Sequence, residues 1–311
     1  MTTLQTVRIG TRASTLARAQ TDWVAARLGG LAIEIVPVST QGDRSAEPLA
    51  QLGGTGVFVS ALRDALVQSR IDVAVHSFKD LPVGAVDEIA LGAVPTREDA
   101  RDALVARDGL TLGELPPGAR VGTGSPRRAA QLRALGLGLE VVPIRGNIDT
   151  RLAMVADGRV DGVLLALAGL RRIGRAGEVT EIIDPLQMLP APAQGALAVE
   201  CRADDEAMVA LLSALDDVDA RATATAERAI LAALQAGCSA PIGAMAEIAV
   251  ADEGPELYLR GSVTALDGND AVRCSTTGST TQAEEVGRRL AADLLDSGAT
   301  MMMESSNDTS A

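Results

Sequence analysis

Lysine and histidine are almost missing from this chain. Of its 28 lysine and arginine residues only Lys79 is a lysine, and the single histidine, His76, lies three residues before it. Arginine therefore supplies nearly all of the positive charge, a composition typical of a GC-rich genome. Chance could leave one lysine in such a background, but the lone lysine makes residues 76–80 the first candidate for a functional segment.

Cysteine is also scarce, with three residues that lie far apart and form no CxxC pair. This number and spacing fit neither a disulfide framework nor a zinc site, so we expect reduced thiols and no bound metal. Cys201 and Cys274 alternate with apolar neighbours and are expected to pack inside strands. Cys238, in the glycine-flanked segment LQAGCSAPIG, is expected to be exposed enough to be modified, although an inert thiol is the alternative.

Two further absences limit the class of protein. No apolar run reaches the roughly 18 residues of a membrane span, and no charged-then-apolar leader follows Met1, so we expect a cytoplasmic protein without membrane contact. The net charge of -13 argues against a nucleic-acid partner. With 47% apolar and 22% charged residues, the 311-residue chain is expected to fold into two or three globular domains.

Short apolar runs alternate with amphipathic stretches over the first two-thirds of the chain, which is typical of βαβ units. The first unit is expected to contain strand 7–11, helix 14–28, strand 32–39, helix 58–68, strand 71–78 and strand 88–94. A second unit, beginning near residue 98, is expected to contain strand 120–123, a helix opened by Ser125 and Pro126, strand 139–144, helix 148–156 and strand 161–168.

The segments IGTRAS (9–14) and VGTGSP (121–126) are alike, which indicates two similar lobes, and strand 196–200 is expected to cross back to the first. A different pattern follows, with helices 204–215 and 222–235, strands 244–250, 256–265 and 271–277, and helix 281–296. This order predicts a small α+β domain. The predicted domains are 1–96 with 196–214, 97–195, and 215–311.

Basic residues follow four of the predicted strands, where ligands bind in open α/β sheets. They are Arg12, then Lys79, then Arg127 and Arg128 after Ser125, and finally Arg145 with Arg151. Two of these loops also open helices, whose free N–H groups favour anions. Each arginine alone could be a solvated surface charge. Four basic loops on one predicted edge instead indicate a ligand with several carboxylates or phosphates.

Asp80 is the one acid among these bases. It could simply cap a turn before Leu81 and Pro82. The functional interpretation is a carboxylate at a reacting centre, able to stabilise a cation and to move protons. Because Lys79 and Asp80 are adjacent, their side chains should diverge, one toward the acid groups of a ligand and the other toward its reactive core.

Segments spread over nearly the whole chain resemble the porphobilinogen deaminase family, also called the hydroxymethylbilane synthases. The matching segments are GTRAS (10–14), VSTQGD (38–43), GVF (56–58), DVAVHSFKDLP (72–82), RED (97–99), VGTGSPRR (121–128), IRGN with TRL (144–152), LALAGLRR (165–172), LPAPAQGA (189–196), ECR (200–202), ERA (227–229) and GCSAPIG (237–243). Their number and common order make the resemblance far more specific than any single motif.

The resemblance implies a dipyrromethane cofactor joined to Cys238 by a thioether. Four porphobilinogen molecules would then add in turn, each losing ammonia, and hydrolysis would release the linear tetrapyrrole of porphyrin biosynthesis. The family's catalytic aspartate corresponds to Asp80. The resemblance assigns cofactor binding to Ser77, Lys79, Thr123, Ser125, Arg127, Arg128 and Arg151. It assigns substrate binding or the lining of the cleft to Arg12, Ser14, Arg145, Arg172, Phe58 and Gln194.

Some positions depart from the family's usual pattern. Thr55 and Gln51 replace frequent lysines in a loop that is mobile in the family, which puts a lid contact to substrate in doubt. Gly124 stands where serine is common and removes one hydroxyl donor to the cofactor. Pro126 replaces a frequent leucine, but proline is well tolerated at the first turn of a helix.

The expected fold class is α/β, with two doubly wound lobes like those of type II periplasmic binding proteins and a smaller α+β domain that carries Cys238. A monomer is expected from the resemblance alone. The alternative from another class is a non-catalytic two-lobed binding protein for a polycarboxylate, which would need neither Asp80 nor a modified cysteine. A catalytically dead relative is the third possibility.

Overall fold

The computed structural model describes residues 6–38, 56–235, 240–251 and 254–304 of the chain. By the density of their contacts these residues form two units. The first consists of Met1–Glu98 with Ala196–Arg221, and the second of Asp99–Gly195 with Ala222–Ala311. Each unit is described below by itself.

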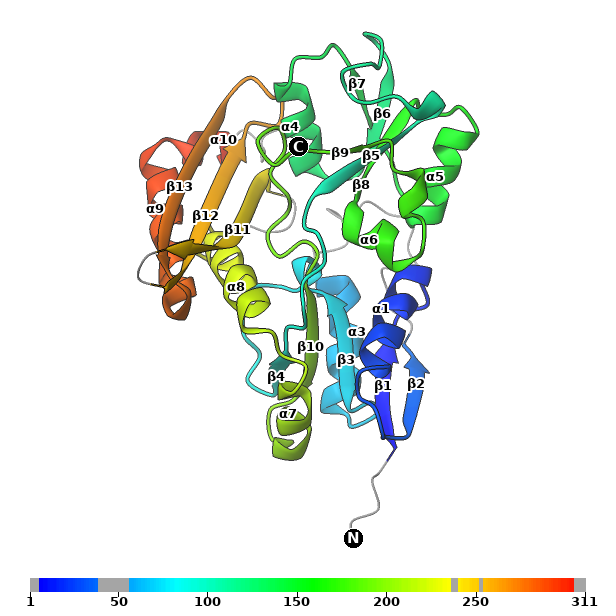
Figure 1. Cartoon of the computed structure of the whole chain (residues 1–311), viewed down its shortest axis with the longest axis vertical. Helices are drawn as coiled ribbons and strands as arrows, with labels where there is room; N and C mark the ends of the chain where they lie inside the picture. The colour runs from blue at the N-terminus through cyan, green and yellow to red at the C-terminus, as the bar shows by residue number, and fades with distance from the viewer. Residues whose placement is uncertain (1–5, 39–55, 236–239, 252–253, 305–311) are drawn as a thin grey trace. The chain divides into compact units, whose positions relative to one another are not determined.

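The first unit is a lobe built on a five-stranded mixed sheet of order β2-β1-β3-β10-β4 (Figure 1). Strands β1, β2 and β3 are parallel, and β10 runs antiparallel between β3 and β4. The elements are β1 (Val7–Thr11), α1 (Thr15–Ala25), β2 (Ile33–Pro37), α3 (Gly56–Val67), β3 (Val73–Ser77), β4 (Ile89–Ala93), β10 (Leu197–Arg202) and α7 (Glu206–Ser213).

Helices cover both faces of this first sheet. Val24 at the end of α1 and Leu212 of α7 pack in one apolar core with the strands. Leu62 and Leu66 of α3 pack in a second core, on Ala74 of β3. The lobe is therefore doubly wound, as predicted.

The second unit begins with a lobe whose sheet has the order β7-β6-β8-β5-β9. Here β6, β7 and β8 are parallel and β5 runs antiparallel to β8, so the strand pattern repeats that of the first lobe. The elements are β5 (Asp102–Ala106), β6 (Arg120–Thr123), α4 (Pro126–Ala134), β7 (Glu140–Pro143), α5 (Ile148–Ala156), β8 (Gly162–Ala166), α6 (Leu167–Arg172) and β9 (Glu181–Ile182).

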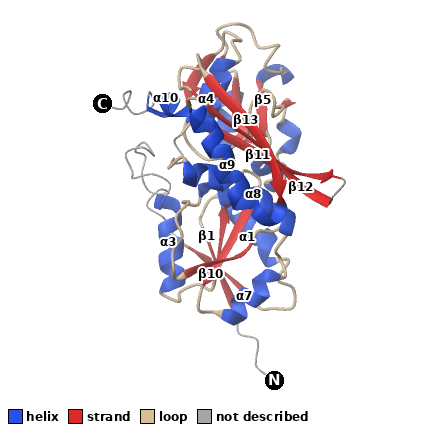
Figure 2. Ribbon diagram, turned by 90° about the vertical axis from the view of Figure 1, so that its left-hand side faces the viewer, coloured by secondary structure: helices blue, strands red, loops and turns tan. Residues whose placement is uncertain are grey.

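A three-stranded antiparallel sheet and three helices complete the second unit. The elements are α8 (Val218–Ala233), β11 (Ile242–Ala251), β12 (Gly254–Thr264), β13 (Ala271–Ser279), α9 (Ala283–Asp296) and α10 (Ala299–Glu304). Ile230 of α8 and Leu290 of α9 pack with Leu257 and Leu259 of β12 in one core. Figure 2 shows helices α8 and α9 next to the strands of this sheet. This part is held to the neighbouring lobe by a hydrogen bond from the Ala244 N–H to the Pro190 carbonyl, 2.9 Å long.

These observations confirm the predicted fold class of two α/β lobes and a smaller α+β domain. The return of β10 to the first sheet is also confirmed. The expectation of a single strand over 161–168 is wrong, because the strand ends at Ala166 and α6 begins at Leu167. Strand β5 was not predicted at all.

A buried ion cluster joins three elements of the first lobe. Glu200 of β10 accepts hydrogen bonds from Nε and Nη2 of Arg63, on α3, at 3.0 and 2.6 Å. Nε2 of His76, on β3, lies 3.3 Å from the same carboxylate. Burial raises the pKa of Glu200, but His76 and Arg63 outweigh it and lower that pKa to about 2. The sole histidine thus lies within β3, the strand that leads to Lys79, next to a buried carboxylate.

The low pKa of Glu200 predicts an acid-dependent loss of stability. Folding favours the charged form of Glu200, so its ionisation adds to the free energy of unfolding above the ordinary pKa of 4.5, and this contribution is lost as pH falls from there toward 2. The contribution to the free energy of unfolding is on the order of 3 kcal/mol. We expect Glu200→Gln to lower the melting temperature at pH 7 and the gap from wild type to narrow below pH 4.5. The exposed Glu140→Gln is the control, and a gap that is constant with pH would contradict the assignment.

Candidate functional site

Two of the predicted basic loops lie at one edge of the first sheet. Arg12 directly follows β1, and Ser14 caps α1 by accepting a hydrogen bond from the Ala17 N–H at 3.2 Å. The neighbouring parallel strand β3 ends at Ser77 and passes into a turn of 3-10 helix, Phe78–Asp80. The carboxyl ends of parallel neighbours meet at the same edge, so these two loops are adjacent within this lobe.

The turn at Phe78–Asp80 is anchored from both sides. Ser77 Oγ accepts a hydrogen bond from Nε2 of the buried Gln20, on α1, at 2.8 Å. The N–H of the buried Phe78 donates to the carbonyl of Ala196 at 3.0 Å. Lys79 and Asp80 are half-buried. These two hydrogen bonds fix the turn in which Lys79 and Asp80 stand next to each other at the end of β3.

The other two basic loops lie at one edge of the second sheet. Thr123 ends β6, and its Oγ1 accepts a hydrogen bond from the Ser125 N–H at 3.2 Å. Ser125 caps α4 by accepting from the Arg128 N–H, and Pro126 occupies the first turn, as predicted. Arg145 follows the parallel neighbour β7. The four loops are thus divided between two sheets, two in each, and do not share the single edge that was expected.

Arg127 and Arg128 are buried and share one carboxylate, Asp102. Nη2 of Arg127 lies 2.8 Å from Oδ2, while Nε and Nη2 of Arg128 lie 3.0 and 2.8 Å from Oδ1. Gln194 Nε2 donates to the same Oδ1 at 2.7 Å. The chain therefore brings three of the predicted ligand-binding residues together around an aspartate that the sequence interpretation did not name.

Arg151 lies in a concentration of positive charge. Its Nε donates to the Gly146 carbonyl at 2.9 Å. Burial, together with the charges of Arg128 and Arg145, lowers the pKa of the Arg151 guanidinium to about 10. A cation destabilised by its cationic neighbours is stabilised when an anion binds, so this end of the lobe favours a carboxylate or phosphate ligand.

The remaining predicted residues are placed less fully. Arg172 ends α6 and donates from Nη2 to the Gly195 carbonyl at 2.6 Å. Phe58 lies in α3, but its side chain is outside the described residues. Cys238, Thr55 and Gln51 lie outside the described residues as well.

The other two cysteines pack in strands, as expected. Cys201 is fully buried in β10, and Cys274 packs against the core in β13. Burial first, then Asp205, raises the pKa of the Cys201 thiol to about 11.

Gly124 has a steric role in this chain. A Cβ at this position would lie 2.6 Å from the carbonyl oxygen of Ile144, which is a backbone atom. A serine at this position would therefore force the segment before Arg145 to move. Gly124 permits close packing of the β6 and β7 loops, at the cost of a hydroxyl.

This contact predicts that Gly124→Ala destabilises the protein by about 1–3 kcal/mol, because the added methyl overpacks the loop. Differential scanning calorimetry should show the loss as a fall of a few degrees in melting temperature. Gly113→Ala is the matched control, since nothing lies within 4 Å of a Cβ built there. Equal melting temperatures for the two variants would show that the Ile144 carbonyl moves freely.

Asp102 and Gln20 are the residues of this region that the sequence interpretation missed. Asp102 opens the apolar run DALVA three residues after the RED segment ends, and an acid at the head of a buried strand is a signal that it needs partners. Gln20 has no comparable signal, because one amide on a helix does not reveal what it contacts.

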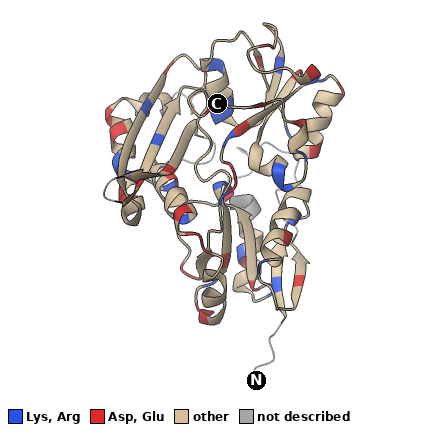
Figure 3. Ribbon diagram, in the orientation of Figure 1, with Lys and Arg blue, Asp and Glu red and all other residues tan. Residues whose placement is uncertain are grey.

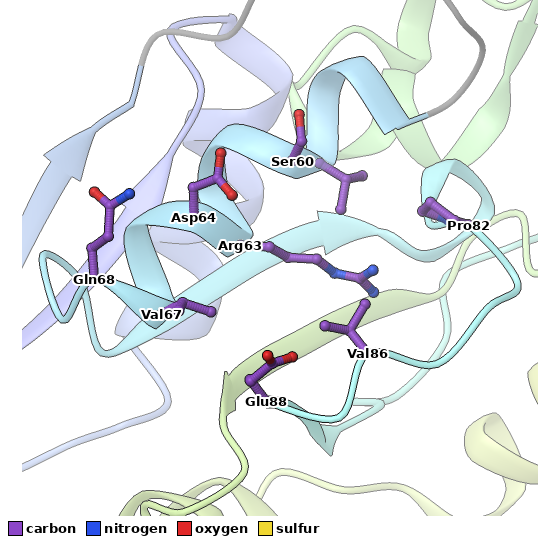
Figure 4. A pocket seen from close by; sticks show the side chains of 9 residues that line it. Ser60, Arg63, Asp64, Val67, Gln68, Pro82, Val86 and Glu88 are labelled. Atoms are coloured by element: carbon purple, nitrogen blue, oxygen red, sulfur yellow. The ribbon is translucent and has the colours of Figure 1, made fainter.

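A pocket of about 430 Å³ lies elsewhere on the first lobe and contains none of the predicted site residues. It is lined by residues of α3 and of the segment between β3 and β4, including Ser60, Asp64 and Glu88. Figure 4 shows Arg63 extending from α3 toward Val86 in this pocket. The guanidinium is already paired with Glu200, so the pocket presents no uncompensated charge from that residue.

Charged residues of both signs occur throughout the described chain (Figure 3). No group of three histidine, cysteine, aspartate or glutamate side chains in that part of the chain is arranged to hold a metal ion. No helix among the same residues has the length and apolar character of a membrane span.

Two family models match the chain in succession. The model described as "Porphobilinogen deaminase, dipyromethane cofactor binding domain" matches residues 7–210, and "Porphobilinogen deaminase, C-terminal domain" matches residues 221–296. A porphobilinogen deaminase of Mycobacterium tuberculosis (strain ATCC 25618 / H37Rv) is 57% identical over 304 residues, which cover 96% of this chain and 98% of that protein. The enzyme of the same name from Mycobacterium avium (strain 104) is 56% identical and covers 96% of each chain.

Solved structures give weaker likenesses. The L-cystine solute receptor of Neisseria gonorrhoeae, in an unliganded open conformation, has a TM-score of 0.37 at 16% identity, covering 68% of this chain and 84% of that one. A likeness of this size says nothing about function.

Proposed function

The chain belongs to the porphobilinogen deaminase family, and on this premise we propose that it condenses four porphobilinogen molecules head to tail, with loss of ammonia, to hydroxymethylbilane. The observation that carries the proposal is the 57% identity over 304 residues to a protein of that name. The product is the linear tetrapyrrole of porphyrin biosynthesis. The proposal includes a monomeric, cytoplasmic enzyme with three domains, 1–96 with 196–214, 97–195, and 215–311.

The residues of the second lobe fit a dipyrromethane cofactor. Its acetate and propionate groups need cationic donors, and Arg151 stands beside Arg128 and Arg145 with a depressed pKa. Arg127 Nε is buried and has no hydrogen-bond partner within the described residues. We assign cofactor binding to Thr123, Ser125, Arg127, Arg128 and Arg151 in this lobe and to Ser77 and Lys79 in the other. When bound, the cofactor would supply the pyrrole carbon that is extended.

Asp80 is assigned the catalytic role. Loss of ammonia from porphobilinogen leaves an electron-poor, cationic pyrrole. A carboxylate beside the pyrrole N–H groups stabilises this cation and accepts or returns protons as the amine leaves and the new bond forms. The anchored 3-10 turn keeps Asp80 in position, so little reorganisation is needed during the reaction.

Cys238 and the arginines bring the reacting partners together. Cys238 would hold the cofactor through a thioether, and such a tether would make the addition effectively intramolecular, which can contribute several kcal/mol to lowering the barrier. Substrate binding is assigned to Arg12, Ser14, Arg145, Arg172, Phe58 and Gln194, and the arginines among them would hold the substrate carboxylates. Because every pyrrole unit has the same two acid groups, the same guanidinium groups can hold successive units.

Turnover of porphobilinogen by the purified protein tests this proposal. We expect four ammonia molecules to be released for each linear tetrapyrrole formed. The rival function, a polycarboxylate-binding protein, predicts that porphobilinogen binds and is recovered unchanged. Binding without ammonia release would therefore favour the rival.

A further inference from the structure

Asp102 is a fully buried carboxylate at the head of β5, and both of its oxygens are occupied. Oδ1 accepts from Arg128 Nε at 3.0 Å, from Arg128 Nη2 at 2.8 Å and from Gln194 Nε2 at 2.7 Å. Oδ2 accepts from Arg127 Nη2 at 2.8 Å. One carboxylate thus joins strand β5, helix α4 and the loop before β10.

The carboxylate of Asp102 is charged at neutral pH. Burial raises its pKa, but the guanidinium groups of Arg127 and Arg128 lower it well below its ordinary range. Such a buried charge is poor evidence for stability, since replacing an ion cluster with apolar groups is often neutral or stabilising. A role in fixing geometry is therefore the interpretation to test.

The contacts of Arg128 show what is fixed. Its Nε and Nη2 donate to Asp102, and its Nη1 donates to the Leu164 carbonyl at 3.0 Å. These bonds set the plane of the guanidinium and leave it no freedom to turn. Arg127 is held in the same way, between Asp102 and the Leu189 carbonyl.

This fixed plane bears on the anion site next to it. The charge of Arg128 is one of those that lower the pKa of Arg151, so the two guanidinium groups lie within electrostatic range. If the Arg128 guanidinium could move away, fewer positive charges would surround Arg151, and the site would favour an anion less. With Asp102 in place, the guanidinium groups are held in position before a ligand binds, so binding adds no entropic cost of ordering these side chains.

Building on the proposed function, we propose that Asp102 is a positioning residue that holds Arg127, Arg128 and Gln194 so that the carboxylates of the cofactor meet a preassembled cationic site. Asp102 itself, as an anion, does not touch those carboxylates. Its effect reaches the ligand only through the two arginines and the amide. The sequence motif that names the arginines gives no hint of this residue.

The matched control is Asp72, in the first lobe. It also lies between two arginines, with Oδ1 2.8 Å from Nη2 of Arg8 and 3.3 Å from Nη2 of Arg202. It precedes β3, at the opposite end of that strand from Asp80. Asp72→Asn therefore removes the same chemical group from the same kind of cluster, away from the proposed site.

The test compares Asp102→Asn, Asp102→Glu and Asp72→Asn as full-length chains. Intact mass gives the fraction carrying two pyrrole units, and steady-state assays give KM and kcat. We expect both Asp102 variants to carry the adduct in a much smaller fraction and to raise KM about tenfold or more, the range for losing a charged hydrogen bond. Asp72→Asn should lower the melting temperature yet keep its loading and KM within about twofold of wild type.

Each outcome decides the question. Loading and KM at wild-type levels in both Asp102 variants would overturn the proposal, as would equal losses of loading in Asp102→Asn and Asp72→Asn. Asp102→Glu keeps the buried charge but displaces it, so this variant alone tests the proposal if Asp102→Asn does not fold. In that case a normal fraction of Asp102→Glu chains with two pyrrole units overturns the proposal, and a reduced fraction supports it. A wild-type chain without adduct would instead refute the proposed function itself.

Discussion

Asp80→Ala is expected to reduce turnover of porphobilinogen by at least about a thousandfold while the protein stays folded and keeps all or part of its adduct. The variant removes the carboxylate assigned both to stabilise the cationic pyrrole and to move protons. Proton transfer alone contributes about 10²–10⁴-fold, and loss of a group aimed at developing charge costs about 10²–10³-fold. Because the anchors of the turn, Ser77 and Phe78, are untouched, the fold of the first lobe should survive.

Two comparison variants separate chemistry from packing. Asp80→Asn keeps the shape of the side chain and removes its charge, so it should be nearly as slow as the alanine variant. Asp22→Ala removes an exposed acid from α1 that pairs with Arg18 four residues earlier, and should leave turnover unchanged. Near-normal turnover in Asp80→Ala would remove this residue from its assigned role.

Cys238→Ser is expected to abolish both the adduct and the turnover. A serine hydroxyl is a poor nucleophile at neutral pH, so no stable link to the cofactor should form. Without the tether, the intramolecular advantage of the addition, several kcal/mol, is lost. Steady-state assays and intact mass of the same preparation measure the two effects together.

The other two cysteines provide the controls for this variant. Cys274→Ser changes a partly buried packing thiol in β13, and Cys201→Ser changes a fully buried one in β10. Both should keep the adduct, although Cys201→Ser should lower the melting temperature because it places a hydroxyl in an apolar core. An adduct that persists in Cys238→Ser and disappears in Cys274→Ser would relocate the attachment site.

Periodic apolar patterns were sufficient to predict much of the fold. The bounds of β1, β6 and α5 match the prediction residue for residue, because each has clear flanking signals such as a serine or asparagine cap. The boundary between β8 and α6 could not be predicted in the same way. It falls inside the continuous apolar run GVLLALAGL, where neither a strand period nor a helix period stands out.

Long-range pairing explains what the sequence could not reveal about the site. The arginines at 127 and 128 were recognised as functional candidates, but their common partner lies some 25 residues earlier in a strand of five residues. The aspartate at the head of DALVA signals a need for partners, but the local pattern does not reveal that these partners are two guanidinium groups. The steric role of Gly124 could not be predicted either, because it depends on the carbonyl of Ile144, which directly follows the neighbouring strand β7.

The mass of the intact, purified wild-type protein tests the central claim most directly. We expect the wild-type mass to exceed that of the 311-residue chain by two pyrrole units, and the mass of Cys238→Ser to show no such excess. A wild-type mass equal to that of the unmodified chain, in protein that is folded and has been exposed to porphobilinogen, would contradict it.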